Sequence, residues 1–116
     1  MSELFQLQTE TSVSIIQMKL PESIDSADFD RLNQNLLALV EGKSSKAWVI
    51  DFTDVDYIGS AMLGLIVNFR QRVQTAKGKL ALCGLSPKLL EIIQTCCLDR
   101  LFRIAKNRQE AIKLVK

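Results

Sequence analysis

The sequence predicts a single α/β domain with a mixed, mostly parallel sheet, an N-terminal hairpin and helices packed against the sheet. The chain has 116 residues, 47% of them hydrophobic, which is the usual size of one domain with its own core. Only two prolines and five glycines are present, so we expect no long linker and one domain over residues 1–116. After two short strand patterns, strand-like and helix-like segments alternate, which is typical of a parallel sheet with helical crossovers.

The first two elements are a predicted hairpin and a helix. Residues 4–9 and 13–18 are β-rich stretches, and residues 10–12 between them favour a turn. Pro21 cannot donate to a strand ladder and is expected to end the second strand. An N-cap at Asp25 or Ser26 then precedes apolar residues at helical spacing, and Gly42 is expected to close this helix.

Residues 47–52 form an apolar run with an acid, Asp51, only near its end, which is the pattern of a central strand covered on both faces. Trp48 and Phe52 are therefore expected in the core. From Ser60 to about Gln74 the pattern becomes helical. One broad stripe of this helix is expected to face the sheet, and it comprises Met62, Leu65, Ile66, Phe69 and Val73.

The C-terminal part repeats the alternation of strand and helix. Residues 80–83 predict a short strand, and Ser86 with Pro87 opens a helix that carries proline in its first turn. Residues 101–104 predict a last strand. Asn107 is expected to cap a terminal helix whose apolar side carries Ala111, Ile112 and Val115.

The charge balance and the residue types present exclude several classes of function. A formal net charge of +2 is too small for non-specific attraction to nucleic acid or to a membrane surface to dominate, so we expect no direct nucleic-acid contact. Histidine is absent, which removes Ser-His and Cys-His dyads and imidazole zinc ligands. The glycines form no phosphate-binding loop, so no nucleotide or other cofactor is expected.

The sequence favours a cytoplasmic location. Residues 1–5 do not resemble a secretory signal, and the apolar runs are far shorter than the roughly 20 residues of a membrane-spanning helix, so no membrane insertion is expected. In a reducing cytosol, Cys83, Cys96 and Cys97 are expected to be thiols. Cys96 and Cys97 lie late in an apolar helical stretch and are expected to be buried or half-buried.

The segment from Val49 to Val67 resembles the signature of the STAS domain, the fold of bacterial anti-sigma-factor antagonists. In that family a strand ending Asp-hydrophobic-Ser/Thr is followed by a short loop, then by aromatic-hydrophobic-Asp-Ser-Ser-Gly-Leu-Gly and an apolar helix. The matching residues here are Ile50-Asp51-Phe52-Thr53, Tyr57-Ile58, Ser60 and Leu63-Gly64. Residues 78–87 and 97–102 resemble two later segments of the family, so the resemblance covers nearly the whole chain.

Four residues depart from the family pattern. Gly59 stands in the place of Asp, Ala61 of the second Ser, Met62 of Gly, and Cys97 of a later Gly. Ser60 keeps the position at which the family's antagonists are phosphorylated. The resemblance implies that a partner docks around this serine, on a surface that we expect to comprise Asp54, Asp56, Tyr57, Gly59, Ala61, Met62 and Leu63.

Ser60 also suits phosphorylation on physical grounds. A serine at the start of a helix is exposed and would carry a phosphate at the positive end of the helix dipole. The alternative is that Ser60 only caps its helix, which would stabilise it by about 1 kcal/mol. Asp54 and Asp56 together are a weak signal for a Mg²⁺ site, and solvated loop acids are the favoured interpretation.

The resemblance implies a regulatory protein of a partner-switching system, and not an enzyme. The unphosphorylated protein would bind an anti-sigma factor that is also a serine kinase, phosphorylation of Ser60 would end the interaction, and a phosphatase would restore it. An alternative is a constitutive STAS scaffold or a subunit of a lipid-transport or signalling assembly, in which Ser60 is not phosphorylated. A third hypothesis is a small thiol enzyme that uses Cys96 or Cys97.

Overall fold

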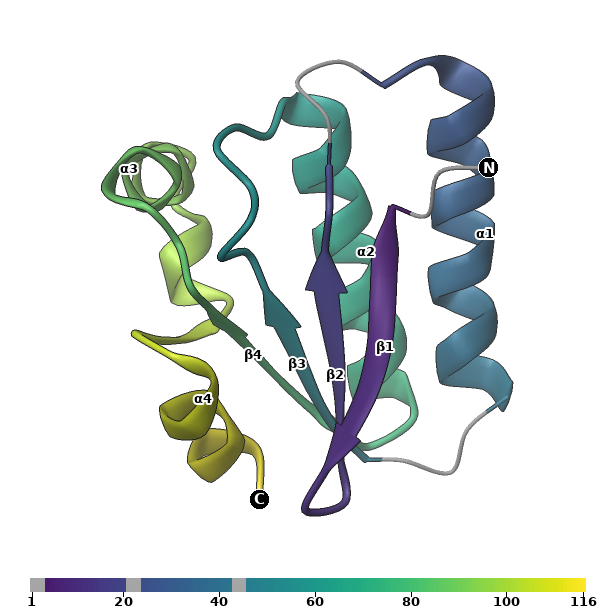
Figure 1. The fold of residues 1–116 in the computed structure, drawn as a ribbon, viewed down its shortest axis with the longest axis vertical. Helices are drawn as coiled ribbons and strands as arrows, with labels where there is room; N and C mark the ends of the chain where they lie inside the picture. The colour runs from purple at the N-terminus through teal and green to yellow at the C-terminus, as the bar shows by residue number, and fades with distance from the viewer. Residues whose placement is uncertain (1–3, 21–23, 43–45) are drawn as a thin grey trace.

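A mixed sheet with helices on both faces forms the framework of the protein (Figure 1). The structure is a computed structural model that describes residues 4–20, 24–42 and 46–116. Within these residues five strands lie in the order β1-β2-β3-β4-β5, with β1 and β2 antiparallel and every other neighbouring pair parallel. The elements in chain order are β1 (Phe5–Glu10), β2 (Val13–Met18), α1 (Ser26–Gly42), β3 (Ala47–Asp51), α2 (Ser60–Thr75), β4 (Lys79–Cys83), α3 (Pro87–Thr95), the 3-10 helix η1 (Leu98–Arg100), β5 (Arg103–Ala105) and α4 (Arg108–Val115). The predicted fold class is confirmed.

Strand β3 lies in the middle of the sheet and has both faces buried. Because side chains alternate along a strand, Trp48, Ile50 and Phe52 face the larger core, which α1, α2 and α3 complete. Val49 faces the opposite side and packs in a smaller core under α4. The ring of Trp48 meets Phe69 of α2 edge to face, at 5.6 Å between ring centroids. The central position of β3 fixes where its carboxyl end, and the loop that follows, leave the sheet.

Three helices begin at polar caps that the sequence predicts. The carboxylate of Asp25 accepts from the Asp28 backbone N–H at 2.8 Å, the hydroxyl of Ser86 from Leu89 at 3.2 Å, and the side chain of Asn107 from Glu110 at 2.9 Å. Each bond satisfies one of the unpaired backbone donors at a helix start. Pro87 occupies the first turn of α3, as expected. Helix α2 differs from the other three at its first turn.

The C-terminal strand is displaced from its predicted position. The sequence predicted residues 101–104, whereas β5 comprises Arg103–Ala105, because Leu98–Arg100 form the 3-10 helix η1 first. Arg70 of α2 donates from Nε to the Leu101 carbonyl and fixes the end of this turn. Pro21 and residues 1–3, on which other expectations rest, lie outside the described residues. None of the helices described is long and apolar enough to cross a membrane.

Candidate functional site

The loop between β3 and α2 carries most of the predicted site residues, and two buried side chains anchor it. Val55 and Ile58 belong to the larger core, and the Val55 backbone N–H donates to the Phe52 carbonyl at 2.9 Å. Between these anchors, Asp54, Asp56 and Tyr57 are exposed. The alternation of anchors and exposed residues holds the acidic loop against the sheet and presents its polar side chains to solvent.

Ser60 is the first residue of α2, and its side chain is exposed. The N-cap is Gly59, which has φ −92° and ψ −179° and supplies no side-chain bond. The Ser60 hydroxyl makes no hydrogen bond to any residue that the structure describes. The alternative that Ser60 is an N-cap is therefore wrong, because the cap position is one residue earlier.

The first turn of α2 offers backbone donors without a competing carboxylate. The first helical hydrogen bond runs from the Leu63 N–H to the Gly59 carbonyl at 3.0 Å, so the preceding N–H groups have no partner within the helix. No acidic residue lies in the first turn of Ser60–Thr75. The positive end of a helix of 16 residues thus lies beside the exposed hydroxyl.

Two members of the predicted docking surface are buried and have to be removed from it. Met62 retains 5% of its exposure and packs in the larger core with Leu63. At 100° per residue, these positions of α2 turn toward the sheet together with Leu65 and Ile66. The candidate surface (Asp54, Asp56, Tyr57, Gly59, Ser60 and Ala61) therefore excludes Met62 and Leu63, which support it from within.

A partly buried ion pair lies at the carboxyl end of β3 and was not predicted from the sequence. Arg108 at the start of α4 donates to Asp51 Oδ2 from Nε at 3.2 Å and from Nη2 at 2.9 Å. The Asp51 side chain retains 7% of its exposure and that of Arg108 25%. Asp51 Oδ1 accepts from both the backbone N–H and the hydroxyl of Thr53. The carboxylate thereby joins α4 to the first residues of the loop.

The surroundings of Asp51 determine its charge state. Burial raises the pKa of Asp51, and the hydrogen bonds from Thr53 and Arg108 lower it by more, so the pKa lies below its ordinary value of 3.8. Gly84, with φ +70°, comes so close that an added Cβ would lie 2.5 Å from Thr53 Oγ1 and 2.7 Å from Asp51 Oδ1. A glycine is required here by both the backbone conformation and the space.

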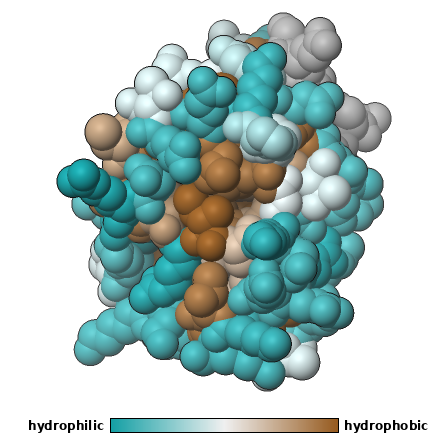
Figure 2. Space-filling model, turned by 90° about the vertical axis from the view of Figure 1, so that its left-hand side faces the viewer, coloured by the Kyte–Doolittle hydropathy of each residue, from teal (hydrophilic) through white to brown (hydrophobic). Residues whose placement is uncertain are grey.

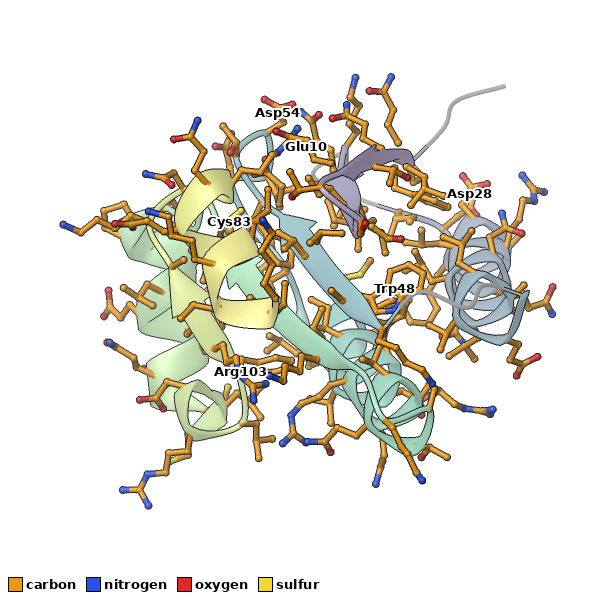
Figure 3. The ribbon with its side chains drawn as sticks, turned by 90° about the horizontal axis from the view of Figure 1, so that it is seen from below. Glu10, Asp28, Trp48, Asp54, Cys83 and Arg103 are labelled. Carbon is orange, nitrogen blue, oxygen red and sulfur yellow. The ribbon has the colours of Figure 1, made fainter. Side chains whose placement is uncertain are left out.

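The hydrogen-bond network continues from Arg108 to the acidic loop. Arg108 Nη1 donates to Gln8 Oε1 at 2.7 Å, and Nη2 lies 3.4 Å from Gln17 Oε1. Gln17 in turn donates from Nε2 to Asp54 Oδ2 at 2.7 Å. Figure 3 shows Asp54 and Glu10 at the same edge of the molecule, and Glu10 Oε2 lies 4.0 Å from Arg108. The position of one exposed loop acid is therefore coupled to β1, β2 and α4.

The loop acids and the cysteines are not gathered into one cluster. Among the residues that the structure describes, no three metal-ligating side chains gather, and Asp54 is already engaged by Gln17. Cys96 and Cys97 are exposed, so the expectation of burial is wrong. They lie beyond the last turn of α3, and Cys97 has φ +59°, a left-handed conformation that ends the helical path before η1 begins. Burial, and then the nearby carboxylate of Asp51, raise the pKa of the buried Cys83 thiol to about 12.

Known proteins share both the sequence pattern and the fold. BtrV of Bordetella bronchiseptica, which is named as an anti-sigma factor antagonist, is 29% identical over 93 residues, which cover 80% of this chain and 79% of BtrV. An anti-sigma-factor antagonist (STAS) domain protein of Planctomyces limnophilus superposes with a TM-score of 0.81 at 24% identity, over 95% of this chain and 96% of that one. The phosphorylated form of the Bacillus cell fate determinant SpoIIAA superposes with a TM-score of 0.71 at 18% identity, over 97% and 99% of the two chains. Because the model of the STAS domain matches residues 6–111, the chain belongs to the STAS-domain family.

Proposed function

We propose that this protein is a partner-switching regulator of the anti-sigma-factor antagonist type, and not an enzyme. With Ser60 unphosphorylated, the candidate surface binds an anti-sigma factor that is also a serine kinase. The kinase transfers a phosphoryl group to the Ser60 hydroxyl, the complex dissociates, and a phosphatase restores the binding form. The kinase supplies the ATP site, so this chain needs none of its own.

The observation that carries the proposal is the unengaged hydroxyl of Ser60. It is exposed, it makes no hydrogen bond to the described residues, and Gly59 occupies the cap position in its place. A kinase therefore breaks no intramolecular contact of that hydroxyl when it takes Ser60 as a substrate. A serine that capped its helix would lose a stabilising bond on modification.

The charge at the site accounts for the dissociation. A phosphate adds about −1.5 to −2 charges, and the positive end of α2 stabilises it, so the fold remains intact. The added charge lies in the same short segment as the exposed carboxylates of Asp54 and Asp56. A partner that docks there through cationic groups and close packing would meet a larger negative charge and the bulk of the phosphate. The affinity for the partner therefore falls, while the fold keeps its stability.

The relatives support the same assignment. BtrV carries the name of an anti-sigma factor antagonist and aligns with four-fifths of this chain. SpoIIAA, which shares the fold, has been solved in a phosphorylated form. We extend both properties to this chain as parts of the proposal.

The test is partner capture by Ser60 variants, with the purified serine-kinase anti-sigma factor of the same organism as the probe. Ser60→Ala is expected to bind permanently, and Ser60→Asp to bind at least about tenfold more weakly at an unchanged melting temperature. The matched control is Ser26→Asp. Ser26 is likewise an exposed first residue of a helix, but it lies on α1, outside the candidate surface. The control is expected to bind as the wild type does.

The constitutive scaffold is the second candidate, and Gly59 is the observation that favours it. The carboxylate that the family usually places before its serine is missing, and with it one group that could orient a kinase. If Ser60→Asp captures the kinase as tightly as the wild type does, and no phosphate appears on Ser60 of the wild type, the protein is a constitutive scaffold and not a partner-switching regulator.

A further inference from the structure

The candidate surface around Ser60 is too small to be a complete protein interface. It consists of the six residues of the loop and the first turn of α2 defined above. A stable interface of standard size uses about 20–30 residues on each side. A partner that binds this surface must therefore contact neighbouring elements, and the structure indicates which one.

Helix α3 adjoins the candidate surface through one side-chain contact. The ammonium group of Lys88 lies 5.7 Å from the centroid of the Tyr57 ring, at the distance of a cation–π interaction. Tyr57 is half-exposed, although it is among the largest apolar side chains of the chain. The contact shows that the flank of α3 that carries Lys88 faces the loop before Ser60.

The same flank of α3 contains a shallow hollow of about 330 Å³. Its lining residues follow helical spacing from the first to beyond the last turn and are Lys88, Glu91, Ile92, Thr95 and Cys96. At 100° per residue they lie on one side of the helix, next to the buried stripe of Leu89 and Ile93. Figure 2 looks at the side of the molecule that carries α3 and shows apolar side chains gathered in a band with hydrophilic borders.

We infer that the docking surface continues from Ser60 across Tyr57 onto this flank of α3, and that the hollow receives an apolar side chain of the partner. The inference rests on the proposed function and commits to its partner, the serine-kinase anti-sigma factor. The Tyr57–Lys88 contact makes the flank of α3 continuous with the candidate surface, which supports this occupant. The hollow also suits an apolar side chain, because most of its exposed lining is apolar and its charged lining residues are one cation, Lys88, and one carboxylate, Glu91. The exposed carboxylates of the loop add charge complementarity, because they would pair with cationic groups on another part of the same partner.

Two neighbouring residues of α3 give a matched test. Thr95 and Gln94 are both exposed, but only Thr95 lines the hollow. Thr95→Arg is expected to weaken capture of the purified kinase at least about tenfold, whereas Gln94→Arg leaves it within about twofold. Both variants should keep the melting temperature of the wild type, because neither position is buried. Equal capture by Thr95→Arg and the wild type would overturn the inference.

A chemical footprint tests the same surface without a bulky substitution. Cys97→Gly removes one exposed thiol at a left-handed position that suits glycine and leaves Cys96 as the exposed thiol of the described residues. Maleimide labelling of Cys96 is expected to slow at least about fivefold when the kinase is bound. Unchanged labelling in the complex contradicts the inference. If Ser60→Asp still weakens capture in that case, the proposed function stands and only its extension to α3 fails.

Discussion

Arg108, the first residue of α4, donates two hydrogen bonds to the carboxylate of Asp51, which lies 57 residues earlier at the end of β3. This pair connects the last helix to the strand from which the acidic loop departs. The same carboxylate accepts from Thr53, and the arginine reaches the glutamines of β1 and β2. The loop that leads to Ser60 therefore begins at a fixed and charged point of the sheet.

Replacing Asp51 with Asn should lower the free energy of unfolding at neutral pH by about 3 kcal/mol, because Arg108 is left without its buried counter-ion. The wild type should also lose stability more steeply in acid. Since the folded-state pKa of Asp51 lies below 3.8, its contribution is complete above the unfolded pKa of about 4 and disappears as the pH falls through the folded value. Urea unfolding of both proteins from pH 7 to pH 2 measures the difference, and parallel curves would contradict the assignment.

Gly84→Ala should destabilise the protein by at least about 1–2 kcal/mol, because a Cβ at φ +70° would be strained and would collide with Thr53 and Asp51. Gly64→Ala is the matched control. Gly64 lies within α2, and among the described residues no atom beyond its chain neighbours and its own helix backbone stands within 4 Å of a Cβ added there. This change should therefore stabilise the protein by about 0.5–1 kcal/mol. Chemical denaturation compares the two, and the same sign for both would show that the packing around Gly84 is not as described.

The strands and helices could be predicted from the sequence because their signals are local. Asp25, Ser86 and Asn107 mark helix starts within a few residues of the apolar pattern that they precede. The run from Ala47 to Phe52 reads as a central strand because neither face carries a polar side chain before Asp51. Helix η1 was missed because three residues are too few to show a period.

The network at the sheet edge could not be predicted, because its partners are far apart in the chain. Arg108 and Gln8 are separated by 100 residues, and the sequence gives no sign that they meet. Met62 was assigned to both the buried stripe and the docking surface, and only the packed helix decides between the two. Cys96 and Cys97 are exposed because α3 ends at Thr95, before them, and side-chain apolarity alone does not indicate where a helix ends.

The burial of Met62 makes a direct prediction about α2. Met62→Lys places a charge in the larger core and should lower the free energy of unfolding by at least about 3 kcal/mol. Ala61→Lys, one residue earlier and exposed, should leave stability nearly unchanged and weaken partner capture instead. Thermal unfolding beside capture separates the two effects. If Met62→Lys kept the melting temperature of the wild type, Met62 would be exposed and would belong to the docking surface.

The cysteines should divide into two reactivity classes. Maleimide is expected to label Cys96 and Cys97 in the folded protein, whereas Cys83, which is buried and has its pKa raised to about 12, reacts only after unfolding. Intact mass after labelling, with and without denaturant, counts the reacted thiols. Rapid labelling of Cys83 under native conditions would contradict its burial in the smaller core.

Phosphorylation of Ser60 is proposed to switch partner binding without unfolding the protein. The most direct measurement incubates the purified complex with ATP and follows the intact mass of this chain, its release from the kinase and its thermal unfolding together. We expect Ser60 to gain one phosphoryl group, Ser60→Ala to gain none, and the chain to be released in step with modification. The melting temperature should stay within about 3 °C of that of the unmodified protein. A chain that remains bound with Ser60 unmodified, or that dissociates without gaining phosphate, would contradict it.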